Sequence, residues 1–315
     1  MSAAAQIVGA GASLAKLALR SPLAANVGFR LVRAPLRVLS YHTVDDAEAF
    51  DRQLEWLVAH APVVDAPAVL DAANGGPSLP PGAVWVTFDD GDPSVVDMGL
   101  PVLERHGVSA TLFVCPGLIE AGTRSWWRVV EDAGAARASA ALGRRFASVS
   151  EAQEHLKSLP DDERRKVVLC LQRTTDEPVR AQMTVDDLQR WVAAGHHVGN
   201  HTWDHPCLDQ AQAALQRDQV RQADRWLRDH VEDWRPIFAY PNGNHDPVSE
   251  AELEALGYEV AVLHDHRLTT LDGSHLRLSR LHTEASDPVE RFRSVVSGVQ
   301  PVLADVGRRL AFARR

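Results

Sequence analysis

The sequence predicts an α/β protein built around a parallel β-sheet. Short apolar runs of strand length alternate with segments whose apolar residues recur at helical spacing. The run 83–88, the segment 95–106 and the run 110–114 form one compact β-α-β unit, and such units join parallel strands through a right-handed crossover. Chemically active side chains directly follow several of these strands. Because the carboxyl ends of parallel strands share one face of a β/α barrel, we expect a site there.

The same alternation continues along most of the chain. Gly195 ends the helix that Thr184 caps, and Gly298 ends the last helical segment. The expected strands are 36–40, 63–64, 83–88, 110–114, 196–200, 237–240 and 258–263, and the expected helices are 48–60, 95–106, 184–194, 209–229, 248–256 and 288–297. An open doubly wound sheet is the alternative to a barrel, although it would spread the strand ends along a line.

Two regions depart from this rhythm. Residues 1–35 are rich in alanine and predict an N-terminal helical extension before a barrel that spans 36–315. Residues 120–183 are rich in alanine, arginine and glutamate and show no clear strand pattern. We interpret them as a helical insertion or lid on the barrel.

Composition excludes several classes of protein. The net charge is -9 and the basic residues are scattered, which argues against a nucleic-acid binder. Cys115, Cys170 and Cys207 are far apart and suggest no disulfide framework, so a reducing compartment is expected. No apolar run is long enough to span a membrane, and the N-terminus makes a poor signal peptide. We expect a cytoplasmic protein with no stable membrane insertion, although its N-terminal segment could lie on a membrane surface; the oligomeric state is open.

The pair Asp89-Asp90 is the most informative feature of the chain. It follows the apolar strand 83–88 and precedes Gly91, which forces a turn. Two adjacent carboxylates are costly unless something compensates their charge. A bound metal ion removes this cost when one carboxylate becomes a ligand and the other stays free as a base. An ordinary acidic turn is the alternative for the pair taken alone.

A second polar motif follows the predicted strand 196–200. His201 and His205 are four residues apart, so both rings can face one point. Together with Asp90 they offer two nitrogens and one oxygen, which is the layout of a catalytic zinc site with a position left for water. We expect one divalent metal ion, zinc in the first place, although cobalt, nickel and iron suit the same donors. Loop histidines without a metal are the alternative.

These motifs resemble those of the polysaccharide deacetylases of the NodB-homology type, the carbohydrate esterase 4 superfamily. The run 87–91 matches the family pattern T-F-D-D-G, and 201–205 matches H-[ST]-x-x-H. The run 238–243 resembles the F-x-Y-P-x-G variant. The resemblance covers roughly residues 36–300 in the right order, and it implies a distorted (β/α)7-type barrel that removes N-acetyl groups from amino sugars with a metal ion.

The resemblance also implies a role for individual residues. Asp89 would be the general base, while Asp90, His201 and His205 would hold the metal. Further roles carried over are an oxyanion contact from the backbone N–H of Tyr240, a groove wall from Pro241, Asn242 and Gly243, and support of the histidine motif by Thr202.

Three departures from the family pattern change the expected site. Ala239 stands where the family often has an arginine that orients the base, and Arg280 is the expected substitute. The later D-x-x-D-W motif is absent. The catalytic acid is ambiguous. His282 is preferred to His264 by its order along the chain, and a further alternative is that neither histidine serves as the acid.

Three more residues are candidates for substrate contact. Trp126 and Trp127 could stack on a sugar ring, or they could be core aromatics. His42, which follows the first strand, could line the cleft or support another side chain.

The sequence therefore predicts a metal-dependent hydrolase that removes N-acetyl groups from an amino sugar in a glycan or a glycan precursor. A deformylase or another amide hydrolase on the same scaffold is the first alternative. A non-catalytic glycan-binding or assembly protein is the second, because the arginine and the acid of the family pattern are not evident.

Overall fold

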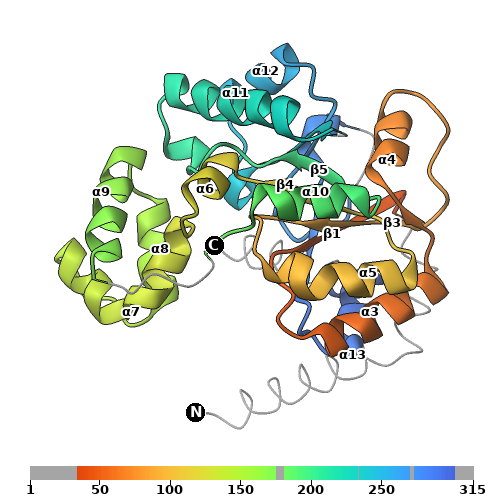
Figure 1. Cartoon of the computed structure of the whole chain (residues 1–315), viewed down its shortest axis with the longest axis horizontal. Helices are drawn as coiled ribbons and strands as arrows, with labels where there is room; N and C mark the ends of the chain where they lie inside the picture. The colour runs from red at the N-terminus through yellow and green to blue at the C-terminus, as the bar shows by residue number, and fades with distance from the viewer. Residues whose placement is uncertain (1–33, 175–180, 233, 270–272, 302–315) are drawn as a thin grey trace, which may run out of the picture.

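The computed structural model describes residues 34–174, 181–232, 234–269 and 273–301 (Figure 1). Its sheet follows the order β7-β6-β5-β4-β3-β1-β8 with β2 beside β3, and these strands pair in parallel. The strands are β1 (Leu36–Tyr41), β2 (Val63–Val64), β3 (Ala83–Phe88), β4 (Ala110–Val114), β5 (His197–Asn200), β6 (Trp234–Ala239), β7 (Val260–Val262) and β8 (Leu281–His282). This curled parallel sheet confirms the predicted distorted (β/α)7-type barrel.

Helices surround the sheet in the expected alternation, and the short helices α4 (Ala66–Ala73) and α6 (Pro116–Ala121) were not anticipated. The α-helices outside the 120–183 region are α3 (Ala47–His60), α4 (Ala66–Ala73), α5 (Leu100–His106), α6 (Pro116–Ala121), α10 (Val185–Ala193), α11 (Ala213–His230), α12 (Pro247–Ala255) and α13 (Val289–Val296). Single turns occur at η1 (Val95–Gly99), η2 (Leu208–Gln210), η3 (Pro241–Gly243) and η4 (His275–Arg277).

Side-chain caps explain where two of these helices begin. Thr184 and Asp187 form a reciprocal capping box at the start of α10, as the sequence pattern predicts. Helix α11 begins at Ala213, later than expected, because Asp209 lies in the η2 turn and its carboxylate accepts a hydrogen bond from Asn244 at 3.1 Å.

The sheet has an apolar cluster on each face, because successive strand residues point to opposite sides. Val38, Trp85, Phe113 and Ile237 belong to one buried cluster, which residues of α4 complete. The second and larger cluster joins the other face of the sheet to α3, α5, α10, α11 and α13. Both faces are therefore covered, which is why β1, β3 and β4 are buried along their whole length.

Between β4 and α10, the chain forms a helical unit that we define as α7 (Trp126–Leu142), α8 (Val149–Lys157) and α9 (Asp161–Gln172). It packs around an apolar cluster of its own and lies beside the barrel (Figure 1). Most of the predicted N-terminal extension lies outside the described residues. No helix in the described part of the chain is both long and apolar enough to cross a lipid bilayer.

Candidate metal and catalytic site

The end of β3 turns sharply at Asp90. The residue has φ 75°, in the left-handed region that aspartate tolerates better than most residues. Its carbonyl accepts a hydrogen bond from the Gln182 side chain at 2.8 Å. Gly91 continues the turn with φ 79°. The turn brings the Asp90 carboxylate close to the residues that follow β5.

The loop after β5 holds its two histidines through local hydrogen bonds. Thr202 and His205 also adopt left-handed backbone conformations, with φ 70° and 61°. The Thr202 N–H donates to Asn200 Oδ1 at 2.7 Å, and the His205 N–H donates to Thr202 Oγ1 at 3.1 Å. Thr202 therefore makes the kind of supporting contact that the resemblance implies.

Asp90, His201 and His205 converge on one point. The Asp90 Oδ1 atom lies 3.3 Å from His201 Nε2 and 3.6 Å from His205 Nε2. The three potential ligand atoms lie within 4.8 Å of one another. Asp90 Oδ1 is buried and has no hydrogen-bond partner among the described residues. A buried carboxylate oxygen left in this way needs a cation or another compensating group.

The donor set fits a divalent metal ion. His201 Nδ1 lies 2.7 Å from the Ala239 carbonyl, which leaves Nε2 directed toward Asp90. Ligand histidines usually donate their second ring nitrogen to such an acceptor. Burial lowers the pKa of His205 to about 3, whereas at His201 burial is outweighed by the contact with Asp90 and the nearby carboxylate charges, which raise its pKa. A ligand imidazole must be neutral, so metal binding would displace a proton from His201. Two imidazoles and one carboxylate suit zinc and its neighbours among the transition metals.

The negative charge of Asp89, unlike that of Asp90, is compensated by an arginine. Arg280 forms a bidentate ion pair with it, at 2.7 Å to Oδ1 and 2.6 Å to Oδ2. Arg280 is 1% exposed and also donates to the Leu263 carbonyl at 2.6 Å. Although burial opposes ionisation, the charge and hydrogen bonds of Arg280 hold the pKa of Asp89 well below its usual range. The carboxylate is thus ionised and held in one orientation.

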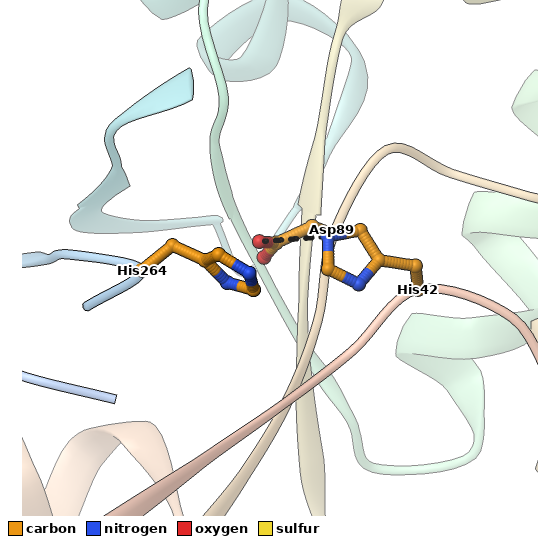
Figure 2. Close-up of side chains that lie close together, drawn as sticks. All are labelled: His42, Asp89 and His264. Carbon is orange, nitrogen blue, oxygen red and sulfur yellow. Dashed lines mark ion pairs between the residues drawn. The ribbon is translucent and has the colours of Figure 1, made fainter. Parts of the chain in front are cut away.

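Two histidines lie beside the Asp89 carboxylate (Figure 2). His42 follows β1, and its Nε2 is 3.9 Å from Asp89 Oδ2. His264 follows β7, and its backbone lies against the η3 turn: a Cβ added to Gly243 would sit 2.5 Å from the backbone nitrogen of His264. This close approach and a φ of 74° together require glycine at 243.

Two cavities at this end of the barrel are lined by both His42 and Asp90. The smaller, of about 210 Å³, is lined by His42, Asp89, Asp90, Trp126, Trp127, Glu131, Gln153, Lys157, His201, His205, Tyr240, Asn242 and His264. The larger, of about 540 Å³, shares His42, Asp90, Trp127 and Glu131 with it. The three converging residues Asp90, His201 and His205, which we call the candidate metal trio, and the Asp89 carboxylate thus face space that a ligand can enter.

A family model for polysaccharide deacetylases matches residues 76–261, more than half of the 315-residue chain. The chain belongs to the polysaccharide deacetylase family. No curated protein matches this deacetylase in sequence. Membership supports carbohydrate de-N-acetylation as the class of reaction.

Solved structures share the fold of this polysaccharide deacetylase. The deacetylase PplD of Streptococcus pyogenes, in complex with acetate, is 18% identical with a TM-score of 0.59, covering 84% of this chain and 98% of its own. IcaB of Ammonifex degensii is 20% identical with a TM-score of 0.56, covering 85% and 97%. The deacetylase domain of BpsB from Bordetella bronchiseptica is 15% identical with a TM-score of 0.57, covering 79% and 96%.

The η3 turn lies at the cavity, but Tyr240 is not placed for the role implied for it. Its N–H donates to the Val262 carbonyl at 3.1 Å, so the sheet already uses the group expected at the oxyanion. Asn242 lines the smaller cavity, with Pro241 and Gly243 in the same turn. The pairing of β6 with β7 explains why the Tyr240 N–H is not free for an oxyanion. Ala239 is paired with Val262, and the hydrogen bonding between the two strands continues to the next residue, Tyr240.

The remaining candidates are divided between the cavity and the protein interior. Trp127 lines both cavities, and its ring centroid is 4.2 Å from that of His205. Trp126 is buried in the cluster of the helical unit, although it also borders the smaller cavity. His282 lines neither cavity, and its Nε2 pairs with Glu284 at 2.8 Å.

Sequence reasoning missed several side chains that the helical unit brings to the cavity. Glu131 of α7 and both Gln153 and Lys157 of α8 line the same space as the candidate metal trio. Each lies on a helix of ordinary composition, so no local pattern distinguishes it. Only the packing of the helical unit against the barrel places them there.

Proposed function

We propose that this polysaccharide deacetylase is a metal-dependent hydrolase that removes N-acetyl groups from an amino sugar in a glycan or a glycan precursor. The convergence of Asp90, His201 and His205 beside a separately held Asp89 carries the proposal. A divalent cation on the trio would supply Lewis-acid polarisation of the acetamide carbonyl and a lowered pKa for water.

The residues of the chain provide the proton transfers. Asp89 accepts a proton from the attacking water, whose oxygen bonds to the acetamide carbon. Arg280 keeps this carboxylate ionised and oriented, as argued from its bidentate contact. Collapse of the tetrahedral intermediate breaks the C–N bond, and an acid protonates the leaving nitrogen. The products are acetate and a sugar amine.

His42 is the acid that the cavity geometry favours. It lines both cavities and lies beside Asp89. His264 lines the smaller cavity, but burial and the charge of Arg280 lower its pKa to about 2, which leaves it uncharged at neutral pH. His282, the first choice from the sequence, lines neither cavity and pairs with Glu284, which borders the larger one. We rank the three in this order.

The test is acetate release from N-acetylhexosamine oligomers, with the metal content of the same preparation measured. We expect release that a chelator abolishes and that added zinc or cobalt restores. Formate release from formamido sugars in place of acetate would establish the deformylase alternative. Glycan binding without any turnover would establish the non-catalytic one.

The acid is tested by three matched variants, His42→Gln, His264→Gln and His282→Gln. Loss of the acid lowers kcat by about 10²- to 10⁴-fold. We expect this loss for His42→Gln with bound metal unchanged. If His264→Gln or His282→Gln shows the larger loss instead, the ranking is wrong while the deacetylase proposal stands.

A further inference from the structure

The helical unit contacts the metal-binding loop at Asp204. This residue lies between the two histidines of the trio, in the run 201–205. Arg165 of α9 donates to both of its carboxylate oxygens, at 2.7 Å to Oδ2 and 2.8 Å to Oδ1. The contact joins segments 39 residues apart in the chain. It is bidentate, the strongest geometry for an arginine–carboxylate pair.

Arg165 is itself held from behind. Its Nε donates to Asp161 at 2.5 Å, and Asp161 also pairs with Arg164. Asp161 is 4% exposed and Arg164 is 2% exposed, whereas Arg165 keeps 41% of its side chain in contact with solvent. The buried Asp161 carboxylate therefore orients the Arg165 guanidinium toward the loop.

The backbone of the 201–205 loop is in a conformation that requires restraint by surrounding contacts. Thr202 and His205 both have positive φ, which costs free energy for residues other than glycine. Such a conformation persists only where surrounding contacts determine it. The barrel supplies some of these contacts: Gln219 of α11 accepts from the Asp204 N–H at 3.0 Å, and the Gly117 N–H donates to the Trp203 carbonyl at 2.8 Å.

The helical unit touches the same loop at a second point. Trp127 of α7 packs on the imidazole of His205, with ring centroids 4.2 Å apart. The side chain of Asp204 and the ring of His205 are thus both held by helices that are not part of the barrel. The loop that carries two of the three potential ligands lies between the barrel and the helical unit.

We propose that Arg165 is a positioning residue for the metal site, acting through Asp204. The helical unit then does more than border the cavity: through this ion pair it holds the loop in the conformation that points His201 and His205 at Asp90. The inference rests on the proposed metal-dependent function, and it predicts that metal affinity depends on a side chain that contacts no ligand.

The experiment measures the dissociation constant of Co²⁺ by competition with a chelator, together with the absorption spectrum of the bound ion. The variants are Arg165→Met, Arg165→Lys and Asp204→Asn. Residues that orient metal ligands change affinity by about 10- to 100-fold, and we expect about a tenfold weakening for Arg165→Met and Asp204→Asn. Arg165→Lys should fall between these and the wild type, because lysine keeps the charge but not the fork.

Lys166→Met is the matched control. Lys166 is the next residue of α9, and it pairs with Asp162 at 3.1 Å on the exposed surface. It should leave both the affinity and the spectrum unchanged. The double variant Arg165→Met/Asp204→Asn should be no weaker than either single variant, because both remove the same contact.

The outcomes separate this inference from the function on which it rests. Wild-type protein that binds no metal at all overturns both. Wild-type binding with unchanged affinity and spectrum in Asp204→Asn and Arg165→Lys overturns only the positioning role, and these two milder variants decide the question if Arg165→Met does not fold. Weakening in the double variant equal to the sum of the single effects also overturns it.

Discussion

Two groups of three potential ligands lie side by side at the end of β3, and they are built in opposite ways. Asp90 faces His201 and His205 and leaves a buried carboxylate oxygen without a hydrogen-bond partner in the described part of the chain. Asp89 faces His42 and His264, yet both of its oxygens are occupied by Arg280. Adjacent residues of one chain thus have contrasting surroundings.

The difference shows how one pair of carboxylates can serve two purposes. A guanidinium of fixed positive charge beside Asp89 disfavours a second cation there, because like charges repel most strongly where water is excluded. The Asp90 group has no such fixed cation: its neighbours are two imidazoles, which leaves a place for a divalent cation. We infer that the arginine decides which carboxylate binds the metal and which stays available as a base.

Asp90→Asn is the change expected to have the largest effect. It removes the anionic ligand while keeping the shape of the side chain. We expect loss of the bound metal and a fall in kcat/KM of about 10⁴-fold, which corresponds to the several kcal/mol that a metal ion supplies to the transition state. Metal analysis and acetate release check this. Retention of stoichiometric metal would contradict the assignment of the trio.

Asp89→Asn should separate the two carboxylates. We expect a fall in kcat of about 10³-fold from loss of the base, with metal content close to that of the wild type. Without metal, this variant should also be less stable than Asp90→Asn, because it leaves the buried charge of Arg280 without its partner. Chemical denaturation of the metal-free proteins gives the comparison. The reverse order of stabilities would count against it.

Arg280→Met tests the compensation itself. It leaves the Asp89 carboxylate buried and unpaired, so the free energy of unfolding should fall by about 3–5 kcal/mol at neutral pH. Arg280 is the main cause that lowers the pKa of Asp89 against the opposing effect of burial, so this pKa should rise. Because the base must be ionised, the acid limb of kcat/KM should move to higher pH.

Arg277→Met is the matched control for that change. Arg277 pairs with Glu250 at 2.6 Å, but its side chain is 46% exposed. Removing it should leave the pH profile of kcat/KM unchanged. An equal shift in both variants would mean that general loss of positive charge, rather than the contact with Asp89, causes the effect.

His196→Gln should have the smallest effect. It removes a buried imidazole for which no carboxylate contributes to the pKa. Burial is the main cause that lowers the pKa of His196 to about 4, with the nearby His197 adding to it. As the pH falls below about 6.5, His196 therefore binds a proton in the unfolded chain before it does so in the folded protein. The free energy of unfolding decreases between about pH 6.5 and pH 4. Between pH 7 and 5 the wild type should lose about 2 kcal/mol more than the variant in denaturant titrations. Equal losses would show that His196 is not held neutral.

The sequence by itself determined the type of fold and the convergence of Asp90, His201 and His205. Alternation of apolar runs depends on local spacing, and it predicts the parallel strands from β1 to β7 well. Asp90, His201 and His205 follow strand ends, and parallel strands bring those ends together whatever the loops between them do. The turn residues beside them, such as Gly91 and Gly243, are also evident, because their backbone conformation restricts which residue can stand there.

Only the tertiary structure decided how the rest of the site is built. The sequence could offer Arg280 as a partner for Asp89 but could not show a contact across 191 residues of chain. It ranked His282 above His264 and did not consider His42 as the acid, because order along the chain does not report which ring lines a cavity. Likewise, the hydrogen bond from Tyr240 to Val262 and the pairing of Arg165 with Asp204 depend on register and on helix packing. Local patterns report spacing within one element, whereas these contacts arise from the relative placement of elements, which all of the packed core sets at once.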